Sequence, residues 1–299
     1  MHFESSYFNK SCSTEFVTQR TLFPLPDFVW KLIPSKVKYE TDAMNARERV
    51  ESCGRKVIAA AQKRSKNADD SESFVNYLLK AEEGFKLTDA EVISNILTMF
   101  VAGSDTTAVA IAWAFYFLSL HPEAMEAARA EAMGLDDSKH NTPLTATEKM
   151  AGLRYCNACL TEAMRLRSPV MWLLFQSVSG EDYTLSSGLK ISGKGTTALA
   201  LDAAKRDPVV FEEPERYNPQ RWLTEDEEKL RAMREYCISF GGGPRTCPGA
   251  DLAVAEGTFA IASMVTRYTW KLACGPHEVK RIVKLSVQVD KMPFVFTPL

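Results

Sequence analysis

The sequence feature that most constrains the fold is a long apolar stretch that begins at Thr88 and ends before Pro122. Thr88 and Glu91 form a capping box, in which each side chain satisfies a free amide hydrogen at the start of a helix. Pro122 begins a new segment. The pattern predicts one helix over 88–121, about 50 Å long at the rise of an α-helix. We expect such a helix to cross the middle of a large domain.

The same stretch could be taken for a membrane span, but polar residues interrupt it. Ser94, Asn95, Ser104 and Asp105 favour a helix buried in protein over one that faces lipid. The first twenty residues are polar and contain no apolar run of the kind found in secretory signals. We therefore expect neither a transmembrane segment nor a signal in this chain.

The remaining patterns predict a mainly α protein with a minor β-sheet. An irregular, Pro-rich segment is expected over 21–36. Apolar residues at helical spacing predict further helices over 40–65, 72–83, 122–133, 147–151, 153–167, 225–235 and 248–268. Short runs with strand character lie near 170–178, 182–192, 195–200 and 282–297.

Charge and cysteine content exclude several classes of protein. The net charge is −2, so the chain has no basic field that would argue for nucleic-acid binding. The seven cysteines are odd in number and show no disulfide framework, which favours a reducing compartment. Cys156 and Cys159 form a C-x-x-C pair inside a helical pattern, without a second pair or nearby histidines. We interpret them as two small buried apolar residues.

A glycine-rich loop around a third cysteine carries the clearest chemical signal. Residues 240–249 read Phe-Gly-Gly-Gly-Pro-Arg-Thr-Cys-Pro-Gly. The glycines would let the backbone approach a flat ligand where side chains would collide. Arg245 can neutralise an anionic group, and the helix expected after Cys247 would stabilise a thiolate through its free amide groups. This combination suits a cofactor bound through a metal.

Two other interpretations of the loop fail, and one stays open. A phosphate-binding loop would need Gly-Lys-Ser/Thr after the glycines, and this chain lacks it. A papain-like nucleophile would need a histidine placed as a base, and no obvious candidate exists. A buried structural cysteine after a Gly-rich turn explains the local residues about as well as a metal ligand does.

The fixed positions of the loop resemble the haem-binding signature of the cytochrome P450 family, F-x-x-G-x-R-x-C-x-G. Phe240, Gly243, Arg245, Cys247 and Gly249 occupy every fixed position of that pattern. The resemblance implies haem b (iron protoporphyrin IX) with an axial thiolate from Cys247, and it implies that the other four residues bind the cofactor. A thiolate ligand favours O–O cleavage in this family.

The long helix contains a second motif of the same family. Residues 102–107 read Ala-Gly-Ser-Asp-Thr-Thr and are similar to the oxygen-activation pattern A/G-G-x-D/E-T-T/S. The resemblance implies that Ala102 and Gly103 pass over the haem face and that Asp105 and Thr106 deliver protons to dioxygen. Ordinary hydrogen bonding of the hydroxyl to the preceding helical turn is the alternative for Thr106.

Two further motifs follow in the family's order. Glu162 and Arg165 are similar to its E-x-x-R pattern and lie on one helix face. The run P-E-R-Y-N-P-Q-R-W at 214–222 resembles the segment that supplies a second arginine, here Arg221. The resemblance implies that these three charged side chains form one buried structural network. Residues 191–196 and 205–208 also look like family landmarks.

The resemblance covers the chain from about residue 20 to its end. It implies a cytochrome P450 fold that lacks the amino-terminal helices, with 1–299 forming a single partial haem domain. The family usually places an arginine near 175–176, where this chain has Phe and Gln. The implied activity is a monooxygenase that inserts one atom of dioxygen into a small apolar organic substrate. A reductase, NADPH-dependent by resemblance, would supply electrons at the cytoplasmic face of the endoplasmic reticulum membrane.

Two alternative functions stay open on the sequence. A haem–thiolate isomerase or dehydratase rearranges a peroxide and needs no reductase, but the intact Asp105-Thr106-Thr107 argues against it. A truncated fragment without catalytic activity is the other alternative, and the absent amino-terminal helices argue for it.

Overall fold

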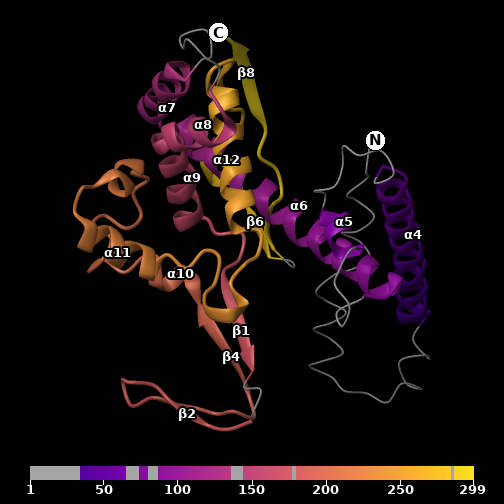
Figure 1. Ribbon diagram of the computed structural model, residues 1–299. Coiled ribbons are helices and arrows are strands. Elements are labelled where there is room, and N and C mark those ends of the chain that lie inside the picture. Colours follow the sequence, from indigo (N-terminus) through magenta and orange to yellow (C-terminus); the bar gives the residue numbers. More distant parts are fainter. Residues whose placement is uncertain (1–33, 65–73, 80–86, 136–143, 177–179, 284–285) are drawn as a thin grey trace. The chain divides into compact units, whose positions relative to one another are not determined.

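The computed structural model describes residues 34–64, 74–79, 87–135, 144–176, 180–283 and 286–299 (Figure 1). The predicted irregular segment 21–36 lies outside these residues except for its last three. Those three open helix α4, because proline fits the first turn of a helix. The chain forms two compact units, Met1–Ser104 and Asp105–Leu299. Its organisation as a single haem domain stays a prediction.

The described part of the first unit is helical. It contains α4 (Pro34–Arg64), α5 (Phe74–Leu79) and the first half of α6 (Asp89–Leu120). Ile58, Val92 and Ile93 form a small buried cluster. A Cβ atom added to Gly54 would lie 3.0 Å from Ile93, so a glycine permits this close approach of α4 to α6.

Helix α6 agrees closely with the predicted long helix. The Thr88 backbone amide donates to Glu91 Oε2 over 2.8 Å, and the Glu91 amide donates to Thr88 Oγ1 over 3.3 Å. These bonds complete the predicted capping box. By length and apolar composition the helix could cross a membrane. Its second half, from Val109 to Leu118, instead contributes to the core of the second unit.

The prediction that the middle of α6 is buried was wrong. Ala102, Gly103 and Asp105 are exposed, and Thr106 is half-buried. Only Thr107 of the motif is buried. The apolar composition of the stretch predicts a helix correctly, but composition alone does not specify which of its turns other elements cover.

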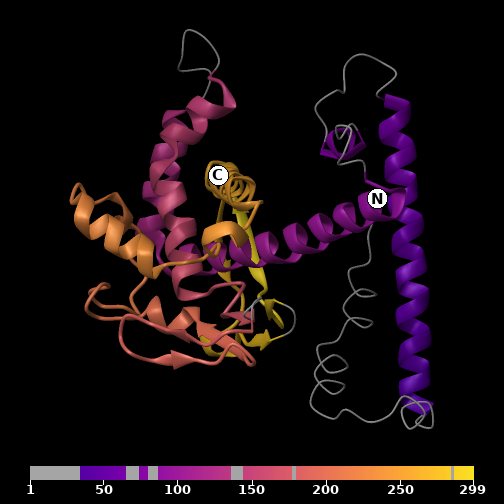
Figure 2. The same cartoon turned by 60° about the horizontal axis from the view of Figure 1, so that its bottom comes forward.

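The core of the second unit is a bundle of helices packed around the second half of α6. The helices α7, α9 and α12 contact one another pairwise and lie side by side in both views (Figures 1 and 2). Gly257 makes one contact possible, because a Cβ atom there would lie 2.6 Å from a Leu160 methyl carbon. The bounds of these helices are α7 Pro122–Gly134, α8 Ala146–Gly152, α9 Arg154–Leu166 and α12 Ala250–Val265.

The strands form four two-stranded antiparallel sheets within the described residues. The pairs are β1 (Trp172–Gln176) with β4 (Thr196–Ala200), β2 (Tyr183–Thr184) with β3 (Lys190–Ile191), β5 (Tyr268–Leu272) with β8 (Phe294–Pro298), and β6 (Arg281–Val283) with β7 (Val287–Val289). The sequence patterns indicate all of these strands except β5. That strand was missed because its first residue was assigned to the preceding helix and 269–272 were assigned to no element.

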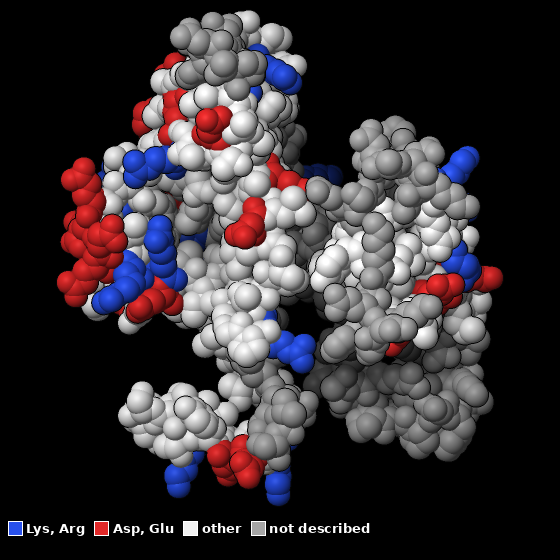
Figure 3. Space-filling view, viewed as in Figure 1, with Lys and Arg blue, Asp and Glu red and all other residues white. Residues whose placement is uncertain are grey.

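Short elements connect the last sheet residues of β4 to the cysteine loop. They are α10 (Leu201–Ala204), the 3-10 helix η2 (Pro219–Leu223), α11 (Glu227–Tyr236) and the 3-10 helix η3 (Gly243–Arg245); a further 3-10 helix, η4 (Pro276–Glu278), follows β5. Acidic and basic side chains are interspersed over α11 on the face in Figure 3. Met233 of the same helix is fully buried, so α11 is amphipathic.

Candidate functional site

The glycine-rich loop turns back on itself between α11 and α12. The Cys247 amide donates to the Phe240 carbonyl over 2.8 Å, which closes the loop. Gly241 and Gly243 have backbone φ angles of 74° and 64°, which residues other than glycine rarely adopt. The glycines therefore give the loop its turn, and the turn determines where Cys247 lies.

Cys247 is exposed at the closing end of this loop, three residues before helix α12. The Ala250 amide donates to the Cys247 carbonyl over 3.4 Å, and the Ala253 amide donates to the Gly249 carbonyl over 2.9 Å as α12 begins. The amino terminus of a helix stabilises a nearby negative charge such as a thiolate. The sulfur of Cys247 is therefore accessible to a ligand, and its role as a metal ligand stays a prediction.

The other loop residues named by the signature differ in exposure. Arg245 and Gly243 are exposed, Gly249 is half-buried, and Phe240 packs against the main core. A Cβ atom at Gly249 would lie 4.0 Å from the Cys247 sulfur. An accessible sulfur, an exposed arginine two residues before it and open space beside Gly242 and Gly243 fit a haem held through its iron and one propionate.

The two arginines of the other motifs, Arg165 and Arg221, both bind the carboxylate of Glu162. Arg165 donates to Glu162 through Nε and Nη2, each over 2.9 Å, and Arg221 Nε donates to Glu162 Oε1 over 3.0 Å. The Asn218 amide and Trp222 Nε1 donate to the same carboxylate over 3.0 and 2.9 Å. Glu162 and Arg165 are fully buried. Five hydrogen bonds therefore satisfy a charge that would be costly without partners.

Arg165 also binds the loops on the far side of this carboxylate. Its Nη1 donates to the carbonyls of Lys205 and Pro214 over 2.9 and 2.7 Å, and its Nη2 donates to the Arg216 carbonyl over 3.3 Å. Its guanidinium lies 4.9 Å from the ring centre of Phe211. One buried arginine thus joins helix α9 to the segment that leads toward α11.

Sequence reasoning missed a buried cation beside this network. The Lys205 side chain is fully buried, and its Nζ donates to Ser168 Oγ over 3.0 Å. Burial lowers the pKa of Lys205, because the ammonium has lost water. The sequence shows only a lysine in a family landmark, and nothing in its pattern distinguishes a buried lysine from an exposed one.

The C-x-x-C pair lies inside α9, where both cysteines are fully buried. Burial raises the pKa of Cys159 to about 12 and raises the pKa of Cys156 further. The two thiols are therefore protonated at neutral pH and poorly reactive. In the described part of the chain, no group of three or more His, Cys, Asp or Glu side chains could hold a metal ion.

The oxygen-activation motif is divided between the two compact units. Ala102 and Gly103 belong to the first, so their place above a haem stays a prediction. Asp105 and Thr106 belong to the second. There Asp105 Oδ2 accepts a hydrogen bond from Gln288 Nε2 over 3.0 Å. The sequence gives no signal for this pair, whose members are 183 residues apart.

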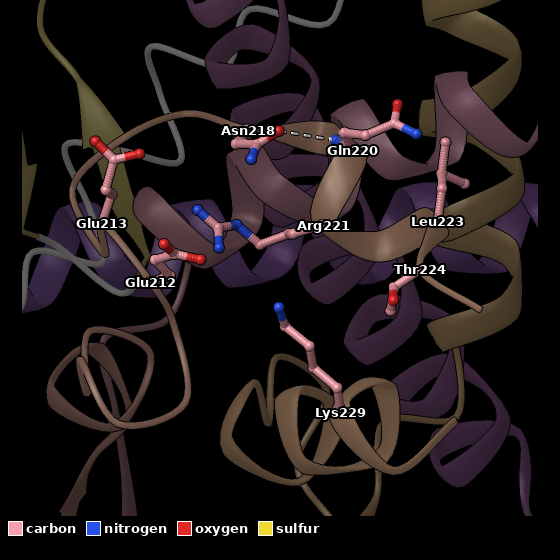
Figure 4. Close-up of a pocket in the computed structure, with 8 residues that line it drawn as sticks. All are labelled: Glu212, Glu213, Asn218, Gln220, Arg221, Leu223, Thr224 and Lys229. Carbon is pink, nitrogen blue, oxygen red and sulfur yellow. Dashed lines mark hydrogen bonds between the residues drawn. The ribbon is translucent and has the colours of Figure 1, made fainter. Parts of the chain in front are cut away.

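A pocket of about 330 Å³ lies beside Arg221 in the second unit. In Figure 4 the guanidinium of Arg221 and the ammonium of Lys229 point into it, and Glu212 faces them. Its walls are mostly polar, so it does not fit an apolar organic substrate. A larger pocket of about 760 Å³ lies in the first unit and has mixed walls. Its lining extends over Glu51–Gln62 of α4 and Asp89–Thr98 of α6.

The helical bundle and the small two-stranded sheets define the class of protein, a mainly α domain with minor β structure. The family model described as cytochrome P450 matches residues 4–291. The chain belongs to the cytochrome P450 family.

Individual relatives agree with this assignment. The chain is 31% identical to cytochrome P450 71A8 of Mentha piperita over 72% of its own length and 42% of that protein. It is 29% identical to cyclooctat-9-en-7-ol 5-monooxygenase of Streptomyces melanosporofaciens, over 86% of the chain and 52% of that protein. The chain therefore spans about half the length of these curated relatives.

Solved structures share the fold. The crystal structure of the cytochrome P450 CYP102L1 matches with a TM-score of 0.80 at 23% sequence identity. That match covers 100% of this chain and 66% of the solved one. The mainly α fold with small sheets predicted from the sequence is confirmed as the cytochrome P450 fold. The coverage agrees with a chain that corresponds to part of such a protein.

Proposed function

We propose that this chain carries the haem–thiolate centre of a monooxygenase, in which the thiolate of Cys247 would hold the haem iron. The observation that carries the proposal is the exposed thiol of Cys247, which lies at the start of α12 in a loop that fills every position of the family's signature. When bound, haem supplies the chemistry that activates dioxygen, and the protein supplies binding, orientation and electrostatics. Arg245 would pair with a haem propionate.

The proposed reaction inserts one atom of dioxygen into an apolar organic substrate. The similarity to a relative named as a monooxygenase supports this reaction type. Asp105 and Thr106 would hold and transfer protons. Electrons would come from an NADPH-dependent reductase, and the site of action would be the cytoplasmic face of the endoplasmic reticulum membrane. These two assignments rest on membership of the family.

The absorption spectrum of the purified, haem-loaded chain tests the assignment of the ligand. The reduced chain with bound carbon monoxide should show the strongly red-shifted Soret band of a thiolate ligand. Cys247→Ala should abolish this band. Cys274→Ala, at another free cysteine that is half-buried, should keep it. An unchanged band in Cys247→Ala at full haem content would overturn the proposal.

A further inference from the structure

Gln288 is held in a fixed place by the backbone around it. It lies in strand β7, where it pairs with Ile282 of β6. The amide of the preceding residue, Val287, donates to the Pro169 carbonyl over 2.7 Å, which ties the strand to the segment after α9. Ser286 and Val287 are buried. The strand therefore has little freedom to shift, and its next side chain reaches α6 from a defined position.

That side chain makes a hydrogen bond with an acid on which the proposed function depends. Gln288 Nε2 donates to Asp105 Oδ2 over 3.0 Å. Asp105 is exposed, so water alone could solvate its carboxylate. The Asp105 carboxylate therefore does not need the hydrogen bond from Gln288 for its solvation. The effect of this bond is to restrict where the carboxylate points.

The chemistry of the partner matters, because Asp105 is proposed to take up and release protons. A carboxamide carries both a donor and an acceptor. Its NH₂ group can donate to the carboxylate, and after a turn of the amide its oxygen can accept from the protonated acid. A lysine or arginine could only donate, and its charge would favour the ionised form alone. A neutral amide can hold the acid in both protonation states.

We propose that Gln288 is a positioning residue that holds Asp105 in place in both its ionised and its protonated form. This inference rests on the proposed role of Asp105 in proton delivery. It extends that role to a residue in a strand near the carboxyl terminus, outside all the sequence motifs. Gln288 itself transfers no proton and contacts the reacting atoms only through Asp105.

The contact can be tested on the chain without haem by nuclear magnetic resonance. The side-chain NH₂ signal of Gln288, assigned by its loss in Gln288→Leu, should move in Asp105→Asn. It should stay in place in Asp290→Asn, which alters an exposed acid two residues further along the chain. An unchanged chemical shift of the Gln288 NH₂ group in Asp105→Asn would overturn the inference at this step.

The positioning role is tested on the haem-loaded chain with a purified NADPH-dependent reductase and no added substrate. Gln288→Leu should slow dioxygen consumption on the order of tenfold or more, within the loss that misplacement of a group can cause. A larger share of the dioxygen should leave as hydrogen peroxide. Gln288→Leu should add little in an Asp105→Asn background, because both changes disable one unit. Gln288→Lys, which can only donate, should also raise the peroxide share.

The outcomes separate the two proposals. If Asp105→Asn raises the peroxide share while Gln288→Leu and Gln288→Lys do not, the positioning role is wrong and the role of Asp105 survives. If the Gln288 signal moves as expected but Asp105→Asn leaves the peroxide share unchanged, proton delivery by Asp105 is wrong and the inference falls with it. A loaded chain without turnover would count against both.

Discussion

Replacing Glu162 by glutamine removes the charge at the centre of the buried network while it keeps the shape of the side chain. Glu162 accepts three hydrogen bonds at Oε1 and two at Oε2. A glutamine could keep its oxygen toward the three donors. Its NH₂ group would then face Arg165 Nε and Trp222 Nε1, which are both donors, and neither bond could form.

The expected loss of stability follows from these contacts. A hydrogen bond to a charged group contributes about 1.5–3 kcal/mol, so two lost bonds amount to roughly 3–6 kcal/mol. Leaving one partner of a buried ion pair uncompensated costs about 3–5 kcal/mol by an independent comparison. Glu162→Gln should therefore lower the free energy of unfolding by about 3–5 kcal/mol. That is a large part of the roughly 5–15 kcal/mol of a typical domain.

Urea unfolding followed by tryptophan fluorescence measures this change, and the chain contains a matched control. Glu215 also pairs with an arginine, Arg206, over 2.9 Å, but its side chain is 70% exposed. Glu215→Gln should cost only about 0–1 kcal/mol. The double change Glu162→Gln with Arg165→Met should cost less than the two single changes together. Equal costs for Glu162→Gln and Glu215→Gln would refute the argument from burial.

Three other predictions concern proton transfer, pH and thiol chemistry. Thr106→Ala should leave haem binding unchanged and divert reductant to hydrogen peroxide; an unchanged ratio of product to reductant would favour a structural hydroxyl and an isomerase. Burial lowers the pKa of Lys205 below its ordinary value of 10.5, so the unfolded state binds more protons just below that pH and stability rises with pH there. Lys205→Met should flatten the dependence of the free energy of unfolding on pH just below pH 10.5, and a curve that matches the wild type would contradict this. A thiol reagent at pH 7.5 should label Cys247 in the folded haem-free chain and Cys159 only after unfolding, as peptide mass analysis would show.

Local signals in the sequence were enough to predict the long helix and most other elements. The capping box at Thr88 and Pro122 after the last turn fix the ends of α6 to within one residue, because helix ends depend on neighbouring side chains. The spacing of Glu162 and Arg165 places both on one face for the same reason. Such features need only a few consecutive residues, which is why they can be read from one sequence.

Features that depend on distant segments could not be predicted in this way. The exposure of Asp105 depends on which elements pack over the middle of α6, and its partner Gln288 comes from the other end of the chain. The burial of Lys205 depends on α9 and on the loop around Ser168. The residues adjacent in sequence to Asp105 and Lys205 do not determine how far tertiary packing buries either side chain.

The cysteine loop is held from both ends by one helix, α9. On its amino-terminal side, Glu162 fixes η2 through Arg221 and Asn218, and α11 then leads to the loop with Met233 fully buried. On its carboxy-terminal side, α12 packs against α9 where Gly257 meets Leu160. Because neither anchor requires a cofactor, the loop can be positioned before haem binds, which lowers the entropy that binding must overcome. A change at Glu162 should therefore weaken haem retention by releasing Cys247, because three of the hydrogen bonds of this carboxylate hold the segment that leads to the loop.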